Sequence, residues 1–345
     1  MNKIIKLNLD EELKNLKNKK EQYTIPIFIP HKGCNNECVF CNQRKISGNL
    51  KEVLPEEVDD IISRYLEYFK NSNKYIEVAF FGGSFTGIDI KLQEEYLAVA
   101  NKYIIQGKVD GIRLSTRPDY ISPRILNLLK KYNVKTIELG VQSLDDNILK
   151  LSKRGHTKLD VIKASRLIKM YGFNLGHQIM IGLPGSSVQT EITTAKEVVK
   201  LAPKELRIYP VYVISPSELY DMYLRGEYVP LEFNEAVERT YEVLKVINTT
   251  DIKVIRLGLQ STDEICSKNE NIVGPVCDNF AEYVFARAVR NKIVETLNSE
   301  MLYQGINVLE VIVPKRYISL VVGPKKVNKI YFKEKFNIDL KVKGE

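Results

Sequence analysis

The segment IPHKGCNNECVFCNQ, residues 29–43, decides how the rest of the sequence is interpreted. It places Cys34, Cys38 and Cys41 within eight residues, whereas the other two of the five cysteines lie far along the chain. An odd and clustered set of cysteines indicates a metal site rather than a framework of disulfide bonds. The segment therefore predicts that a metal centre sits where this loop meets the fold.

The spacing of the three cysteines leaves more than one metal open. Three thiolates can ligate three irons of a [4Fe-4S] cube and leave the fourth iron open, where S-adenosylmethionine can chelate it through its amino and carboxylate groups. Zinc is the second interpretation, because His31 and the three cysteines make a four-ligand set of tetrahedral type. A third interpretation is that the thiols bind no metal.

Around this segment, short apolar runs alternate with segments of helical periodicity. Six strands are expected at residues 25–30, 76–81, 111–116, 136–141, 174–181 and 205–213. Five helices are expected between them at 55–69, 91–105, 123–132, 158–171 and 188–201. Apolar strands separated by helices indicate parallel strands covered by helices, in an incomplete barrel or a doubly wound sheet.

Each unusual motif follows the carboxyl end of an expected strand. These motifs are the cysteine loop, Gly82-Gly83-Ser84, Arg117-Pro118-Asp119, Gln142-Ser143 and Gly182-Leu183-Pro184-Gly185. The carboxyl ends of parallel strands meet at one edge of a sheet, which is where α/β proteins place their active sites. One shared active face is therefore expected.

The two ends of the chain differ from the central residues 21–258. Residues 1–20 are expected to form a polar helix, centred on Leu9 to Lys20. Residues 259–345 are expected to form a small α/β extension. Its expected elements are a helix at 280–297 and short strands at 308–313, 317–322 and 330–332.

Charge and hydropathy restrict the environment and the partners. Lys and Arg total 51 against 43 Asp and Glu, a net charge of +8, with lysines concentrated at both ends. A basic surface of this kind favours a polyanionic partner such as RNA, although a solvated lysine face is the simpler alternative. No apolar stretch suffices for a membrane span, and the charged start lacks a secretory signal. A cytoplasmic protein without membrane contact is expected.

At this point the motifs support a resemblance to a known family. The cysteine loop with Phe40 directly before Cys41, followed by Phe81-Gly82-Gly83-Ser84-Phe85, resembles the radical S-adenosylmethionine (radical SAM) superfamily. The segments at 115–119, 138–145, 154–157, 180–185 and 206–210 resemble the radical domain of the Elongator catalytic subunit and, more distantly, oxygen-independent coproporphyrinogen oxidase. The resemblance covers about residues 20–258 and implies a partial (β/α)6 barrel of radical SAM type.

The resemblance also implies roles for individual residues. Cys34, Cys38 and Cys41 would ligate a [4Fe-4S] cluster, and the cofactor contacts would come from a further set: Phe40, Gly82, Gly83, Ser84, Ser115, Gln142, Arg154 and Gln178. In that set the Gly-Gly turn receives the amino group of S-adenosylmethionine through backbone atoms, and Arg154 pairs with its carboxylate. Gln178 and Ser115 contact the ribose, although Ser115 stands where relatives usually carry an acid. Phe40 packs against the adenine.

Several polar residues near these motifs have simpler explanations than catalysis. His156 and His177 are acid–base candidates, but His156 is more simply part of a helix entry at which Thr157 is the N-cap. Asp119 and Glu138 are expected at the same rim, and Asp119 is expected to form a salt bridge with Arg117.

The function implied by the resemblance is reductive cleavage of S-adenosylmethionine to a 5′-deoxyadenosyl radical, with an electron donor of flavodoxin or ferredoxin type. RNA modification, on tRNA, is the first expectation. The glycines after residue 260 are too scattered for the phosphate-binding turn of an acyl-CoA enzyme, so no acetyltransferase is expected. The alternatives are a radical reaction on a small molecule of coproporphyrinogen type and a zinc-bearing nucleic-acid-binding protein without catalysis.

Overall fold

The computed structural model describes residues 2–15, 22–29, 33–34, 38–42, 53–69, 74–259, 265–266, 271–299 and 305–345. Within these residues the largest feature is a seven-stranded sheet in which every neighbouring pair of strands is parallel. In spatial order its strands are β2 (Gln22–Phe28), β3 (Tyr75–Phe81), β4 (Gly111–Thr116), β5 (Val134–Gln142), β6 (Asn174–Ile181), β7 (Glu205–Pro210) and β9 (Lys253–Leu257). Spatial order equals chain order, which is the arrangement of a barrel.

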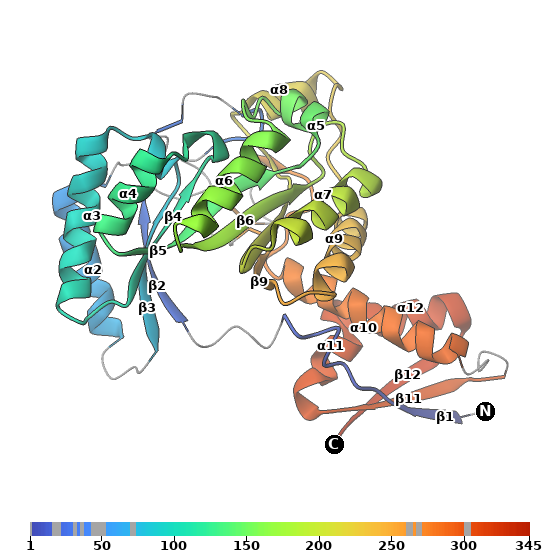
Figure 1. The fold of residues 1–345 in the computed structure, drawn as a ribbon. Helices are drawn as coiled ribbons and strands as arrows, with labels where there is room; N and C mark the ends of the chain where they lie inside the picture. The colour runs from blue at the N-terminus through green and yellow to red at the C-terminus, as the bar shows by residue number, and fades with distance from the viewer. Residues whose placement is uncertain are drawn as a thin grey trace.

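Helices connect successive strands and follow one side of the curved sheet (Figure 1). They are α2 (Pro55–Tyr68), α3 (Ile90–Ile105), α4 (Pro123–Lys131), α6 (Lys158–Met170), α7 (Val188–Leu201) and α9 (Phe233–Asn248). Val58 and Leu97 from this layer share one buried core with Leu114 of the sheet. The expected partial (β/α)6 barrel is confirmed, and β9 adds a seventh strand that the sequence analysis did not anticipate.

A second sheet of three parallel strands lies beside the barrel and brings the two ends of the chain together (Figure 1). Its order is β1 (Asn2–Lys6), β11 (Val308–Val313), β12 (Asp339–Gly344). The long helix α10 (Phe280–Ser299) packs against α9 of the barrel and also against α11 (Ile318–Val322) and α12 (Val327–Phe336). Neither α10 nor any other helix in the described ranges is long and apolar enough to cross a membrane.

The start of the chain corrects one expectation. Residues 2–6, assigned from the sequence to a polar helical segment, form strand β1 and pair in register with β11. Leu9 and Leu13 are buried in the main core. The turns that follow β1 therefore pack against the fold through apolar side chains and are not polar along their whole length. Residues 16–20 of the expected helix lie outside the described residues. A strand of five residues gains its stability from its partner, which local periodicity cannot reveal.

Two short strands expected near the C-terminus are also wrong. Residues 318–322 form helix α11, and residues 330–332 lie inside helix α12. Short apolar runs do not distinguish a strand from a buried helical turn. In α12 the buried positions Asn328 and Phe332 are four residues apart, which is the spacing of one helical face. The strand that completes this sheet, β12, begins after the helix instead.

Candidate functional site

The motifs singled out in the sequence lie at one edge of the barrel, where its strands end. Gly82 follows β3, Arg117 follows β4, Gln142 is the last residue of β5, and Gly182 follows β6. Cys34, beyond the end of β2, is within hydrogen-bonding distance of the turn after β3, because its Sγ lies 3.2 Å from Ser84 Oγ. Segments far apart in the sequence therefore meet at this edge.

The cysteine loop touches the turn after β3 through two glycines. Gly33 has a φ of +72°, and a Cβ at this position would lie 2.1 Å from the carbonyl oxygen of Ser84. A Cβ on Gly87 would in turn lie 2.1 Å from the carbonyl oxygen of Gly33. Backbone fills the space on both sides, so neither glycine tolerates a side chain without movement of the loop.

Replacing Gly33 by alanine is expected to displace the cysteine loop and to remove most of the iron that the protein retains after anaerobic reconstitution. Gly107→Ala is the matched control, because Gly107 has a similar φ of +66° with nothing within 4 Å of its Cβ position. Both variants carry the left-handed backbone cost of about 1–2 kcal/mol. Equal iron content in the two variants would show that the close approach at Gly33 does not position the loop.

Arg154 links the cysteine loop to the end of β5. Its Nη1 donates to Cys38 Sγ at 3.1 Å, and its Nη2 donates to the carbonyl oxygen of Gly140 at 2.7 Å. Arg154 is 6% exposed and Cys38 is 8% exposed, so the contact is shielded from water. Arg154 therefore ties the cysteine loop to the end of β5.

Two buried arginine nitrogens at this edge have no hydrogen-bond acceptor in the part of the chain that the structure describes. Arg117 donates from Nε and Nη2 to the two carboxylate oxygens of Asp119, at 3.0 and 2.9 Å, which confirms the expected salt bridge. Arg117 Nη1 and Arg154 Nε are both buried, and neither has a hydrogen-bond acceptor among the described residues. A buried donor without an acceptor costs about 1–3 kcal/mol, more when charged. These buried donors therefore fit an anionic group.

Arg117 was expected at the active face and in a salt bridge with Asp119, but not beside the cysteine loop. The structure places its guanidinium group, which is 2% exposed, near Cys38. Burial alone would lower the pKa of Arg117, but its hydrogen bond to Asp119 and the charge of that carboxylate raise it. The available signal was an arginine directly after a strand, in the row of motifs at the carboxyl edge. The periodicity of apolar residues does not reveal that the side chain of such an arginine is buried.

The two glutamines expected at the cofactor lie side by side. Gln178 Nε2 donates to Gln142 Oε1 at 3.3 Å. Gln142 has a φ of +64°, and the register of β5 against β6 shifts between Gly140 and Gln142. A bulge at the end of a strand redirects a side chain, and such bulges are common beside active sites. Ser115 lies on β4 opposite Glu138, half-buried and near the same end of the barrel.

The remaining residues expected at the metal and the cofactor are less closely grouped. Phe40 packs against an apolar cluster that contains Val39, Leu183 and Tyr228, so its predicted contact with adenine stays a prediction. The backbone N–H of Cys41 donates to the carbonyl oxygen of Cys38 at 2.9 Å. Across the described ranges, no three His, Cys, Asp or Glu side chains are close enough to hold a metal ion. His31, the fourth ligand of the zinc interpretation, lies outside those ranges.

His156 has the structural role expected of it. Its Nε2 lies 3.3 Å from the carbonyl oxygen of Val141, and burial together with the charge of Arg154 lowers the pKa of His156 to about 3. The next residue, Thr157, is the N-cap of α6 and forms a capping box with Asp160. His156 is therefore neutral near pH 7 and helps to fix the entry into α6.

Two other reactive residues serve the structure in the same way. His177 is 1% exposed, lies 2.9 Å from Ser165 Oγ, and has a pKa that burial lowers to about 3. The Cys277 thiol donates to Asn279 Oδ1 at 3.1 Å, and burial raises its pKa. Neither residue lies in the row of motifs at the carboxyl edge.

A buried network of charges lies deeper in the barrel. Arg113 of β4 contacts Glu77 at 2.8 Å, Glu138 at 2.5 Å and Glu205 at 2.7 Å. Glu138 also accepts from Arg207 Nε at 2.6 Å and Nη2 at 3.1 Å. Burial alone would raise the pKa of Glu138, but the charges of Arg207 and Arg113 lower it to about 2. Glu138 was expected at the rim; it lies in the middle of β5, where it crosslinks three strands instead.

Comparisons with known proteins agree with this fold and site. The sequence profile of the radical SAM superfamily matches residues 28–198, and that of the radical SAM C-terminal domain matches residues 203–290. The two matches include every strand of the barrel from β3 to β9. The chain belongs to the radical SAM superfamily of enzymes.

The more specific relatives are proteins of the Elongator type. A tRNA uridine(34) acetyltransferase from Methanocaldococcus infernus is 35% identical over 193 residues, which are 50% of this chain and 36% of that protein. Elongator complex protein 3 from Homo sapiens is 30% identical over 143 residues, 41% of this chain and 26% of that protein. The chain thus spans about a third or less of the length of these curated relatives.

A solved structure extends the similarity beyond the barrel. The archaeal Elp3 of Methanocaldococcus infernus, with residues 1–46 deleted, superposes with a TM-score of 0.60 and 26% sequence identity. The alignment covers 83% of this chain and 64% of that chain. The resemblance to the Elongator catalytic subunit is therefore confirmed in both sequence and fold.

Proposed function

We propose that this chain binds a [4Fe-4S] cluster through Cys34, Cys38 and Cys41. We propose further that it uses the cluster together with S-adenosylmethionine to modify RNA, and that the RNA is tRNA. A bound cluster supplies one electron that breaks a carbon–sulfur bond of S-adenosylmethionine, giving methionine and a 5′-deoxyadenosyl radical. The electron is delivered by a donor of flavodoxin or ferredoxin type.

One observation carries this proposal: the Cys38 thiol lies against the buried guanidinium group of Arg154, near that of Arg117. The two arginines offer buried N–H groups without acceptors among the described residues, which suits an anionic ligand. A purely structural zinc site contains no anionic ligand group that would accept hydrogen bonds from these donors. A cofactor that carries a carboxylate would accept them.

The roles proposed for the other residues follow from their positions at the edge. The backbone of Gly82 and Gly83, which carries no side chain, can approach the amino group of S-adenosylmethionine closely. The hydrogen-bonded pair of Gln142 and Gln178 presents polar atoms for the ribose. Ser115 and Phe40 complete the set, as the proposed contacts for the ribose and the adenine.

Arg154→Ala is expected to weaken binding of S-adenosylmethionine by roughly 10- to 100-fold, because one charge-assisted contact is lost. The affinity is measured by equilibrium dialysis of reconstituted protein, with iron content determined on the same samples. Arg225→Ala is the control, since Arg225 forms an exposed ion pair with Glu227. Wild-type affinity in Arg154→Ala would show that Arg154 does not hold the cofactor carboxylate.

The RNA substrate is supported by the relatives and by charge. The relative from Methanocaldococcus infernus carries the name of a tRNA-modifying enzyme, and this chain has a net charge of +8. The C-terminal lysines contribute somewhat less to a basic surface than their number suggests, because Lys333 pairs with Asp339 at 3.0 Å.

The experiment that tests the substrate compares modified nucleosides and metabolites between wild-type cells and cells that lack the gene. The proposal predicts that at least one modified nucleoside of tRNA disappears and returns on complementation. An unchanged nucleoside profile with one accumulating metabolite would favour the second candidate, a radical reaction on a small molecule of coproporphyrinogen type.

A further inference from the structure

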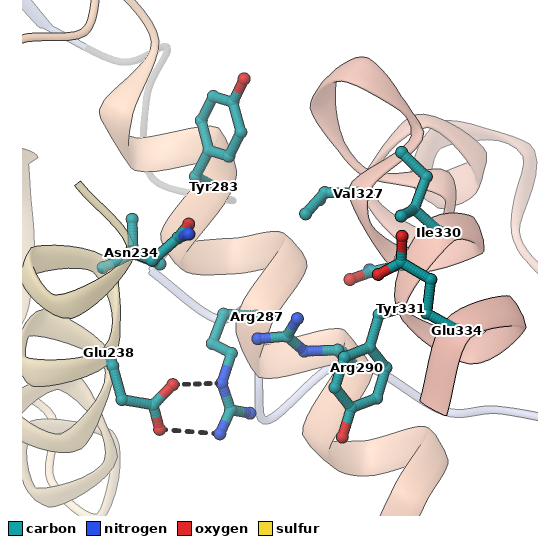
Figure 2. Close-up of a pocket in the computed structure, with 11 residues that line it drawn as sticks. Asn234, Glu238, Tyr283, Arg287, Arg290, Val327, Ile330, Tyr331 and Glu334 are labelled. Carbon is teal, nitrogen blue, oxygen red and sulfur yellow. Dashed lines mark hydrogen bonds and ion pairs between the residues drawn. The ribbon is translucent and has the colours of Figure 1, made fainter. Parts of the chain in front are cut away.

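A pocket of about 350 Å³ lies between a helix of the barrel and two helices of the C-terminal part, and no described residue of the cysteine loop lines it. It is lined by α9, α10 and α12, and Figure 2 shows side chains of all three helices around it. The volume lies within the range of about 300–1,000 Å³ that is usual for small-ligand sites. Asn328 fixes the α12 wall, because its Nδ2 donates to the carbonyl oxygens of Ala286 at 2.9 Å and Val321 at 3.1 Å.

Two arginines of α10 enter this pocket, and their charges are compensated differently. Arg287 forms a two-pronged ion pair with Glu238 of α9, with Nε and Nη2 at 2.5 and 2.8 Å from its oxygens. Arg290 forms no ion pair with any described carboxylate, and Figure 2 shows its guanidinium group inside the pocket. Of the two arginines, Arg290 is therefore the one without a carboxylate at ion-pair distance in the described part of the chain.

The guanidinium group of Arg290 is held in place by an aromatic ring. Its carbon lies 4.3 Å from the centre of the Tyr331 ring. Burial, together with the neighbouring charge of Arg287, lowers the pKa of Arg290, and an anion that reaches Arg290 would offset the repulsion between the two arginines. An oriented, half-buried guanidinium group is suited to binding phosphate through two parallel hydrogen bonds.

The pocket is close to the carboxyl edge of the barrel. A Cβ on Gly258, directly after β9, would lie 3.0 Å from Phe280 at the start of α10. The ring of Tyr283, one turn further, lines the pocket and lies 4.8 Å from that of Phe233, where α9 begins. Both helices thus begin at the edge that carries the candidate site, so one end of the pocket faces that edge.

We propose that this pocket binds the phosphate group of a nucleotide through Arg290. In the stronger form, which rests on the proposed function, the nucleotide is part of the RNA strand whose target base is modified at the barrel. Tyr283 then offers an aromatic ring to an unstacked base between the two sites. In the other form the same chemistry is supplied by a free nucleotide.

The test measures binding of a fluorescein-labelled single-stranded RNA by anisotropy at two salt concentrations, for wild type, Arg290→Gln and Arg316→Gln. Arg316 is the matched control, because it also lies over a tyrosine ring, that of Tyr317, at 4.7 Å, but outside the pocket. Arg290→Gln is expected to bind about 10-fold more weakly, with the slope of log affinity against log salt reduced by about 0.7. Arg316→Gln should stay within about twofold of wild type.

A second variant keeps the test valid if Arg290→Gln fails to fold, because it is expected to change RNA binding in the opposite direction. Glu334 is an exposed carboxylate on the α12 side of the pocket, and Glu334→Gln is expected to strengthen RNA binding a few-fold, by removing a repulsive charge. RNA binding that is the same in Arg290→Gln, Glu334→Gln and wild type would overturn the RNA form of the inference while leaving the proposed function standing.

Titration with adenosine monophosphate separates the two forms. If the wild type binds no RNA but binds adenosine monophosphate saturably, and Arg290→Gln loses that binding, the substrate part of the proposed function fails and the phosphate site stands. If neither RNA nor adenosine monophosphate distinguishes Arg290→Gln from Arg316→Gln, the inference is wrong in both forms.

Discussion

Replacing Glu138 by alanine is expected to lower the free energy of unfolding by about 3–5 kcal/mol, the usual cost of removing one partner from a buried ion pair. Arg113 and Arg207 would keep their charges in the middle of the barrel without the carboxylate that both contact. Glu77 and Glu205 would remain near Arg113, but neither of these two carboxylates forms an ion pair with Arg207. Glu138→Gln keeps the size of the side chain, so its free energy of unfolding should lie between that of the wild type and that of Glu138→Ala.

Equilibrium unfolding by urea of the metal-free protein measures this effect. The matched control is Glu197→Ala, because Glu197 also pairs with two cations, Lys158 at 2.9 Å and Lys200 at 2.6 Å, but at the surface. Exposed pairs contribute about 0–1 kcal/mol, so this control should change little. Equal losses in the two variants would show that the inner network does not stabilise the barrel.

Replacing Cys38 by serine is expected to abolish binding of the iron–sulfur cluster. A serine hydroxyl is a poor substitute for a thiolate at iron, and the remaining two cysteines cannot hold the cube alone. The wild type should carry about four irons and four sulfides per chain after anaerobic reconstitution, and Cys38→Ser should lose them together with the brown colour. Iron and sulfide analysis with the visible absorption spectrum gives the result.

Cys277→Ser is the control for this experiment. Cys277 lies outside the cysteine loop and donates its thiol hydrogen to Asn279, a contact that a serine hydroxyl can replace. This variant should keep wild-type iron. If it lost iron as Cys38→Ser does, the assignment of the ligands to the cysteine loop would be wrong.

The barrel could be predicted from the sequence because most of its strands lie in largely apolar runs between amphipathic helices. β4 and β6 begin and end at the predicted residues, and α7 does as well. β9 was not predicted, because the lysine and arginine in its sequence KVIRL dilute the apolar signal. Its place is fixed by pairing with β7, an interaction between distant parts of the chain.

The C-terminal sheet was less predictable, and for the same physical reason. Strand β11 was predicted at its observed residues, Val308–Val313. Its partner β1 lies at the other end of the sequence, so residues 2–6 alone do not reveal that pairing. The apolar run from Tyr317 to Val322 fits either a strand or a helical turn, and packing against α10 selects the helix. Pairing and packing at long range decide such segments, whereas local preference does not.

The candidate site was predictable to the extent that it depends on motifs. The cysteine loop and the Gly-Gly turn follow strands whose ends had been located, so their meeting at one edge could be expected. Two features could not be predicted, because they depend on the direction of side chains. They are the burial of the Arg117 guanidinium group and the contact between Arg154 and Cys38. A salt-bridged arginine and a cofactor-binding arginine have the same sequence signature.

The central claim is that the cysteine loop makes this chain a radical SAM enzyme in activity as well as in fold. The measurement that tests it most directly is anaerobic incubation of reconstituted protein with S-adenosylmethionine and dithionite, followed by chromatography of the products. The account predicts that 5′-deoxyadenosine and methionine form slowly in equal amounts without substrate, and that Cys38→Ser forms neither. Colourless protein with stoichiometric zinc and intact S-adenosylmethionine after incubation would contradict the account.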